Sequence, residues 1–389
     1  MRGAIEADLA FTRPEDVIPE GDLGRARSLD PAALHDGEAF ALHRCTIADC
    51  STPDGLVPDI KTHGFGHVDL TAISGLSAVL EAARQAGEVS RDQARRIRSA
   101  LTGSTLPLAG GRRLRLLFIA PEGFIMRRGG PNGLRVTDAA TAPGMNNHDA
   151  AVSVHADQDV TGTPLRQLLR GTAPWLFHHR SPLRNNRVSP LFLLNIWVPL
   201  QQATRPLALM DINTLDRSAH QLRYGLETDA FLERPDDQRV NDIWTFLHDP
   251  RQSWFFTSQA DPSRAYIFQT LSTPHGAFIL PGEDRAEQRY LRLSAARDAV
   301  RAADASVLAR LLAAPNPPTS EPLTAPLLAA IAALDAALGV ASSRGAALCA
   351  GEGCAAWEAQ AAAALDGVVR KSIEMRAVGL ITGGWSAAG

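Results

Sequence analysis

Short apolar runs separated by turn residues dominate the middle of the chain. β-branched and aromatic side chains are common within these runs, which is typical of β-strands. We expect strands at Leu114–Ala120, AVSVHA (151–156), PLFLLNIWVPL (190–200), PLALMDI (206–212), SWFFTS (253–258), AYIFQTL (265–271) and GAFILP (276–281). This rhythm favours an antiparallel sandwich or jelly roll over alternating βαβ units.

Two other stretches follow a helical pattern. Apolar residues recur at three- and four-residue spacing between Leu70 and Leu101, which predicts helices. Residues 298–368 are rich in alanine and are interrupted by the proline-rich segment Pro315–Pro326, so we predict a helical insertion there. Strand-like sequence resumes at Lys371–Ile381 and provides the last core strand.

These patterns divide the chain into four parts. We predict an N-terminal arm and helical cover (1–110), a β core (111–297), the helical insertion (298–368), and the final core strand with the C-terminus (369–389). The first 60 residues are expected to be irregular, because they are rich in Pro, Asp and Gly. The predicted fold is mainly β with flanking helices.

Composition narrows the class of protein. The 389 residues carry a formal net charge of −3, so no global basic field favours nucleic acid or an anionic membrane. The N-terminus has no signal-peptide core, and no apolar run approaches the roughly 18 residues of a membrane span. We therefore expect a cytoplasmic protein that acts on a small molecule, with an oligomeric state that the sequence leaves open. The pairs Cys45/Cys50 and Cys349/Cys354 are expected to be reduced thiols.

The strongest chemical signal is His155-Ala156-Asp157. In a strand, residues i and i+2 point to the same face, so this imidazole and carboxylate can meet one cation. A distant histidine would complete a two-histidine, one-carboxylate triad, which suits Fe(II) and leaves positions open for a co-substrate and O2. His275, at the entrance to a predicted strand, is the candidate third ligand.

A triplet of this kind also occurs in ordinary structural pairs. A second one, His67-Val68-Asp69, lies at the start of a predicted helical stretch, where we expect an exposed turn. His148-Asp149 and His178-His179 are adjacent pairs, whose side chains would point to opposite faces of a strand. We interpret both as loop or surface histidines.

The last predicted strand carries a second signal. Alternation places Arg370, Ser372, Glu374 and Arg376 on one face. A guanidinium and a hydroxyl spaced in this way can bind a carboxylate of a dicarboxylic acid. The alternative is a solvated strand face of alternating charge.

Six short blocks occur in one order along the chain. They are Val154-His155-Ala156-Asp157, Asn195-Ile196-Trp197-Val198-Pro199, Pro206–Asp211, Trp254-Phe255-Phe256, His275-Gly276-Ala277-Phe278 and Arg370–Arg376. In this order the chain resembles the 2-oxoglutarate-dependent oxygenases related to the gibberellin-desaturase-like and cephalosporin-7α-methoxylation proteins. The family has an arginine after the tryptophan where this chain has Val198. Its role is either absent here or taken by a neighbour such as Arg205.

The resemblance implies a double-stranded β-helix, the jelly roll of cupin-like proteins, that uses Fe(II), 2-oxoglutarate and O2. By position it implies that His155, Asp157 and His275 hold the iron. Arg370 and Ser372 would bind the far carboxylate of 2-oxoglutarate, with Arg376 assisting or meeting a substrate anion. Asn195 and Trp197 would line the pocket.

The expected activity is oxidation of an unactivated C–H bond in secondary metabolism, by hydroxylation, desaturation or ring formation. Two alternatives remain at this point. One is a cupin-like metalloenzyme that does not use 2-oxoglutarate, and the other is a non-catalytic accessory subunit. Specificity is expected in the loops 122–150 and 170–190, including the arginine-rich stretch 180–187.

Overall fold

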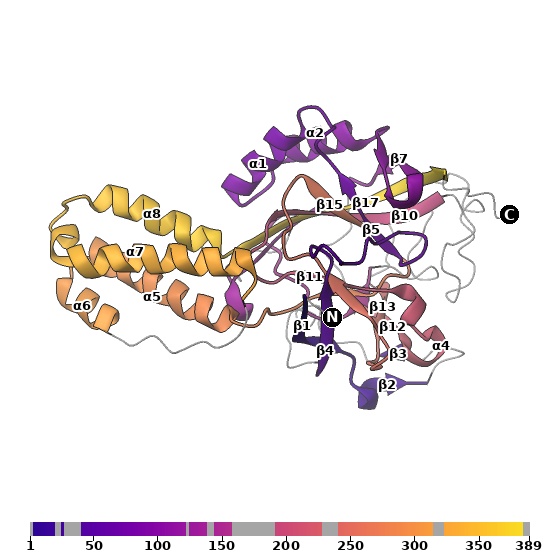
Figure 1. The fold of residues 1–389 in the computed structure, drawn as a ribbon, viewed down its shortest axis with the longest axis horizontal. Helices are drawn as coiled ribbons and strands as arrows, with labels where there is room; N and C mark the ends of the chain where they lie inside the picture. Colours follow the sequence, from indigo (N-terminus) through magenta and orange to yellow (C-terminus); the bar gives the residue numbers. More distant parts are fainter. Residues whose placement is uncertain are drawn as a thin grey trace.

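The computed structural model describes residues 3–19, 25–26, 40–121, 124–137, 144–157, 191–227, 240–313 and 323–383. Two β-sheets pack against each other, and helices cover them in two places (Figure 1). The first sheet has the strand order β1 (Ala4–Phe11), β4 (Ala41–Asp49), β14 (Trp254–Phe256), β11 (Leu207–Met210), β16 (His275–Ala277), β9 (His155–Ala156), β13 (Val240–Phe246), β12 (Gln221–Glu227), β3 (Arg25–Ala26) and β2 (Val17–Ile18).

The second sheet is built around one long strand. Its order is β5 (Phe65–Asp69), β15 (Arg264–Gln269), β10 (Leu191–Gln201), β17 (Arg370–Gly383), β7 (Arg112–Ile119) and β6 (Thr105–Pro107), and β8 (Ile125–Gly129) also pairs with β17. The centre of this sheet therefore reads β8-β17-β10-β15, opposite β14-β11-β16-β9 in the first sheet. This is a jelly-roll-like arrangement, so the coarse prediction of a mainly β fold with flanking helices is confirmed.

The strand β10 is buried on both faces, which explains its continuous apolar sequence. Leu194, Ile196 and Val198 belong to a core under α1 (Leu76–Ala86) and α2 (Arg91–Leu101), whereas Asn195 and Trp197 face the space between the sheets. The helix α2 begins with a capping box, in which Ser90 accepts a hydrogen bond from the Gln93 backbone. The helices predicted between Leu70 and Leu101 are thus present.

Four further helices lie between β16 and β17. They are α5 (Glu283–Arg301), α6 (Ala305–Ala313), α7 (Ala325–Cys349) and α8 (Cys354–Gly367), and together they project from one side of the sheets (Figure 1). Their core is made of alanine and leucine with Trp357, whose indole N–H donates to the Ala337 carbonyl at 2.9 Å. Helix begins at Glu283 rather than near residue 298.

One prediction about this region was wrong. By length and composition, α7 is apolar enough to cross a membrane, with a mean hydropathy of 1.8 over its most apolar window. The sequence contains no long run of large apolar residues here, but many alanines over 25 residues raise the mean hydropathy of the helix as such a run would. A third of that window is buried inside the protein, where Leu327, Ile331 and Leu334 pack on neighbouring elements. A helix that packs in a protein core passes the same test, so the composition alone does not assign a membrane.

Three further expectations need correction. The first 60 residues are not all irregular, because β1 and β4 pair along their full length and extend the first sheet. The paired residues lie 30 to 44 positions apart in the sequence (Phe11 with Ala41, Ala4 with Ala48), and small or charged residues interrupt the apolar pattern of both strands. The second triplet, His67-Val68-Asp69, lies within β5 rather than in a turn. Part of the expected loop 122–147 forms β8.

Several strand bounds also differ. Only His155–Ala156 of the expected strand 151–156 is paired as a strand, and the hairpin of β12 and β13 was not predicted. The remaining described elements are α4 (Arg217–His220) and short 3-10 turns at Pro14–Asp16, Ala109–Gly111, Pro131–Gly133 and Ile212–Thr214. The four cysteines are free.

We predict that the two adjacent leucines of β7 differ sharply in their effect on stability. Leu116 is fully buried beneath α1 and α2, and Leu117 is 42% exposed. Leu116→Ala should reduce the free energy of unfolding by about 2–5 kcal/mol, because it leaves a cavity in the core. Leu117→Ala should cost less than about 1 kcal/mol in the same urea titration. Equal losses would contradict the assignment of faces.

Candidate metal centre

Three of the predicted residues meet at one buried point between the sheets. His155 is the first residue of β9, Asp157 comes directly after this strand, and His275 is the first residue of β16. The two strands pair, and the two histidines are cross-strand partners. Their ring centroids lie 4.4 Å apart, and the Nε2 atom of each lies 3.9 Å from Asp157 Oδ1. Within the part of the chain that the structure describes, this is the one cluster of His, Cys, Asp or Glu suited to a metal.

Hydrogen bonds on the far side of each ligand fix its orientation. His155 Nδ1 donates to the Ser153 carbonyl at 2.8 Å, and His275 Nδ1 donates to the Thr273 carbonyl at 3.0 Å. A carbonyl only accepts, so Nδ1 carries a proton in both rings, and Nε2 is the atom of each ring that faces Asp157 and can bind a metal. Metal-binding histidines usually have such a partner.

A hydrogen bond also fixes the orientation of the Asp157 carboxylate. Asn195 Nδ2 donates to Asp157 Oδ2 at 3.1 Å and leaves Oδ1 facing the two imidazoles. Burial acts to raise the pKa of Asp157, but His275 and Arg376 outweigh it and lower this pKa to about 2. Burial and the neighbouring His275 lower the pKa of His155 to about 4. At neutral pH the cluster therefore contains an ionised carboxylate and a neutral His155 ring, which are the forms that bind metals.

This donor set fits a divalent metal. Ligand atoms held about 2.1 Å from one ion lie at most about 4.2 Å apart, and the 3.9 Å separations fall within that limit. Two histidines and one carboxylate with further positions left open suit Fe(II).

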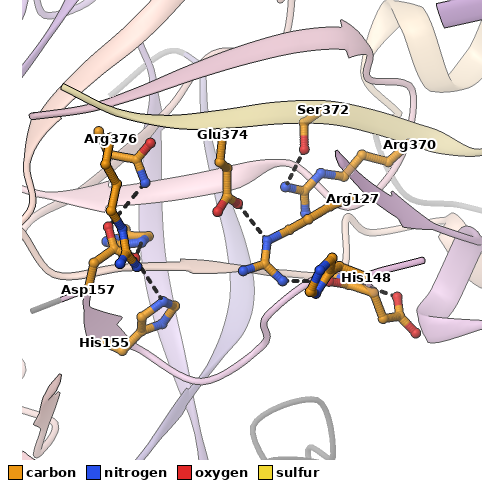
Figure 2. A network of polar contacts seen from close by, with 12 residues as sticks. Arg127, His148, His155, Asp157, Arg370, Ser372, Glu374 and Arg376 are labelled. Carbon is orange, nitrogen blue, oxygen red and sulfur yellow. Dashed lines mark hydrogen bonds and ion pairs between the residues drawn. The ribbon is translucent and has the colours of Figure 1, made fainter. Parts of the chain in front are cut away.

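The inner face of β17 carries charge toward this centre, as Figure 2 shows. Arg376 Nη2 lies 3.8 Å from Asp157 Oδ1. Glu374 is next along the face and accepts a hydrogen bond of 2.6 Å from Arg127 Nε, and Arg127 Nη1 also donates to the Asp149 carbonyl at 2.9 Å. Burial would raise the pKa of Glu374, but Arg127 and Arg370 together outweigh it, so the net shift is downward.

Arg370 and Ser372 lie at the far end of the same face. Arg370 is 1% exposed, and its Nη2 donates to Ser372 Oγ at 3.1 Å. Its Nε and Nη1 atoms are buried and have no hydrogen-bond partner among the described residues. Burial, reinforced by the nearby charges of Arg127 and Arg205, lowers the pKa of Arg370 to about 9, so it remains a cation at neutral pH. A buried cation with unused donors requires an acceptor.

The remaining predicted residues occupy different places. Trp197 is fully buried, with the Arg370 guanidinium 5.2 Å from its ring centroid and its indole N–H without a partner among the described residues. Arg205 does not join the metal cluster; it lines a separate cavity near Arg370. The prediction that Arg205 lines the pocket of the metal centre stays a prediction; the cavity that it lines contains none of the three clustered residues.

The histidines that we expected to lie outside the metal site are in other surroundings, where the structure describes them. His67 is not near the metal cluster; its Nε2 lies 3.2 Å from Thr257 Oγ1. His148 Nε2 contacts the Gly144 carbonyl. His178, His179, the arginine-rich stretch 180–187 and the rest of the loop 170–190 lie outside the described residues.

Arg127 is the residue that sequence reasoning missed. It comes from β8, within a segment that turn residues suggested was a loop, and its partner Glu374 lies 247 positions away. No local pattern identifies such a pair. The alternating face of β17 was the available signal, because the buried Glu374 requires a cationic partner.

Comparisons with known proteins give weak likenesses. A family profile described as an oxidoreductase/YMDC permease-like domain matches residues 126–291, less than half of the chain and outside α7. The structure is similar to that of the iron and alpha-ketoglutarate-dependent endoperoxidase NvfI, with TM-score 0.47 and 12% identity over 98% of this chain and 99% of that one. A second structure of NvfI, in a different conformation, gives TM-score 0.49 and 13% identity over 98% of both chains. No curated protein matches. At these values we infer nothing about function from the similarities, and we base the proposed function on the geometry of the site.

We predict that the purified full-length chain binds one Fe(II) through this cluster. In anaerobic calorimetric titration of the metal-free protein, His275→Ala should weaken binding by more than the roughly 10- to 100-fold that loss of an outer hydrogen-bond partner costs. The matched control is His67→Ala, which removes a histidine from the other triplet. Unchanged binding in His275→Ala, or an equal loss in both variants, would contradict the site.

Proposed function

We propose that this protein is an Fe(II)- and 2-oxoglutarate-dependent oxygenase that oxidises an unactivated C–H bond of a small molecule. One observation carries the proposal. A buried two-histidine, one-aspartate cluster shares the space between two sheets with a buried arginine, two of whose nitrogens have no partner among the described residues. The first feature suits Fe(II), and the second suits the carboxylate of a co-substrate.

The bound iron and keto acid would supply the oxidation, since cleavage of O2 is coupled to conversion of 2-oxoglutarate to succinate and CO2. The protein's own residues do the rest. His155, Asp157 and His275 hold the metal with their outer atoms fixed by hydrogen bonds, so the ligand geometry is set before the metal binds. Arg376 balances the charge of Asp157.

The position of the two arginines along β17 separates their roles. A strand rises about 3.3 Å per residue, so the Cα atoms of Arg370 and Ser372 lie roughly 13–20 Å along the strand from that of Arg376. This exceeds the length of a five-carbon acid, so the long Arg370 side chain would have to extend back toward the metal to reach it. Arg376 lies beside the metal ligand Asp157, and Arg370 lies toward the opposite end of the same face. A dicarboxylic acid that chelates the metal at one end would extend toward Arg370 and Ser372, whose free N–H groups match its second carboxylate.

Trp197 supports this end of the site. Its ring lies beside the Arg370 guanidinium and excludes water from it, which strengthens hydrogen bonds to a bound anion. Its unpaired indole N–H is a further donor near the same position.

The proposal extends to the type of β fold, the family, the metabolic role and the cellular location. The strand order β8-β17-β10-β15 opposite β14-β11-β16-β9 supports a double-stranded β-helix, with α5 to α8 as an insertion before its last strand. Membership of the gibberellin-desaturase-like family, a role in secondary metabolism and a cytoplasmic location are proposed from the sequence blocks and the composition.

We predict that the iron-loaded enzyme converts 2-oxoglutarate to succinate slowly without substrate and that His155→Ala abolishes this turnover. The reason is that His155 supplies one of three metal bonds. Succinate and CO2 would be measured by mass spectrometry and trapped radioactivity. Iron binding without any use of the keto acid would favour a cupin-like enzyme of another chemistry, and absence of iron binding would favour an accessory subunit.

We predict a separate effect at the other end of the site. Arg370→Ala should raise the KM for 2-oxoglutarate about 10- to 100-fold, as expected from the loss of charge-assisted hydrogen bonds of about 1.5–3 kcal/mol. Fe(II) affinity should change little, since Arg370 does not contact the metal ligands. Arg115→Ala, an exposed arginine of the same sheet, is the control. An unchanged KM in Arg370→Ala would assign the anchor to another residue.

A further inference from the structure

A second cavity lies beside the metal centre and is separate from it. It has a volume of about 450 Å³ and lies between β1, the turn Pro131–Gly133 and the link from β16 to α5. Its apolar walls include Ala10, Val152 and Ala277, and none of the three residues of the metal cluster lines it. Five charged residues line it, and among Arg205, Glu6, Asp8 and Arg44 only Arg205 is buried.

Arg205 is a buried cation whose guanidinium makes no ion pair with a described residue, although the charges of Glu283 and Asp149 favour its ionised form. The residue is 4% exposed, and its Nε atom is fully buried with no hydrogen bond to a described residue. No described acidic side chain comes within ion-pair distance of its guanidinium; its one hydrogen bond to a carboxylate is made by the backbone N–H. A buried charge without a close ion pair is costly, so an anionic group bound in the cavity beside it would stabilise Arg205.

The backbone holds Arg205 in this position despite strain. Its φ of +51° lies in the left-handed region, which favours glycine or asparagine. The buried Glu283 carboxylate accepts hydrogen bonds from the backbone N–H groups of Arg205, Leu280 and Asn132 at 2.7–2.9 Å. Glu283 thereby joins three walls of the cavity, and its oxygens accept three of the roughly four hydrogen bonds that a carboxylate can take. A Cβ on Gly133 would lie 3.1 Å from Arg205 Nη1, so this glycine leaves the guanidinium open toward the cavity.

The charges around the cavity define the ligand. Glu6 and Asp8 lie on the exposed face of β1, and Asp149 also lines the cavity. Arg44 of β4 lines it as well and pairs with Asp8 at 3.7 Å, so the three carboxylates outnumber the two arginines. These carboxylates oppose a dianion such as a phosphate monoester, whereas one negative charge can pair with Arg205 inside. The apolar walls suit a hydrocarbon body.

We propose that this cavity is a binding site for a small molecule with one carboxylate on an apolar body, and that Arg205 pairs with the carboxylate. The site is distinct from the one proposed for 2-oxoglutarate, which depends on Arg370. The proposal does not depend on the iron chemistry, because it concerns binding at residues outside the metal cluster.

The test uses hexanoate as the probe and hexan-1-ol as the neutral control, with the full-length protein and binding measured by calorimetry and ligand-observed NMR. Hexanoate should bind the wild type at least about 10-fold more tightly than hexan-1-ol, in line with a charge-assisted pair. Arg205→Met should remove this difference while keeping an apolar side chain of similar length, and Arg205→Lys should restore part of it. Arg370→Met should retain it.

A second variant guards against failure of Arg205→Met to fold. Asp149→Asn keeps the side-chain oxygen that accepts from the Ala150 backbone N–H but removes a competing negative charge from the cavity wall. It should tighten hexanoate binding several-fold with little effect on hexan-1-ol. Equal binding of the two probes to the wild type, loss of hexanoate binding in Arg370→Met alone, or weaker hexanoate binding in Asp149→Asn would overturn the proposal.

Discussion

The cross-strand pairing of His155 with His275 is the contact on which the candidate site depends. It fixes the register of β9 against β16, and the i, i+2 geometry of β9 then brings Asp157 to the same face. A shift of one residue in either strand would turn an imidazole away from the carboxylate. The register is supported by backbone bonds on both sides, where Val154 N donates to the Ala10 carbonyl and Ala277 N donates to the Ala151 carbonyl.

The second sheet adds the charge that this cluster requires. Positive and negative side chains alternate along β17, and Arg127 from β8 pairs with Glu374 at the centre of the row. Arg376 compensates Asp157 at one end. The cation at the other end, Arg370, lacks such compensation, and this asymmetry is the physical reason for placing an anionic ligand there.

The sequence identifies features that depend on local periodicity. The same-face pair His155 and Asp157, and the row from Arg370 to Arg376, follow from the two-residue repeat of a strand. The strand β10 was evident because both of its faces are buried. Features set by distant pairing were not predictable in this way. The strand β1 becomes regular only through its partner β4, and Arg127 acquires its role only through Glu374.

For Arg205 and α7, too, the sequence predicted only part of what the structure shows. Arg205 was predicted as a pocket residue because it could take the role of the arginine that Val198 replaces, but the cavity that it enters depends on the turn that Glu283 holds. The apolar character of α7 is spread over alanines, so its helix was predictable while its hydropathy was underestimated. Local propensity defines elements, and packing between them decides which side chains meet.

The most direct test of the central claim is an anaerobic titration of the metal-free protein with Fe(II), with and without 2-oxoglutarate, followed by visible absorption. We expect a weak charge-transfer band that requires both iron and the keto acid and is absent in His275→Ala. Iron binding with no band in the wild type would contradict the use of 2-oxoglutarate, and failure to bind iron would contradict the metal centre itself.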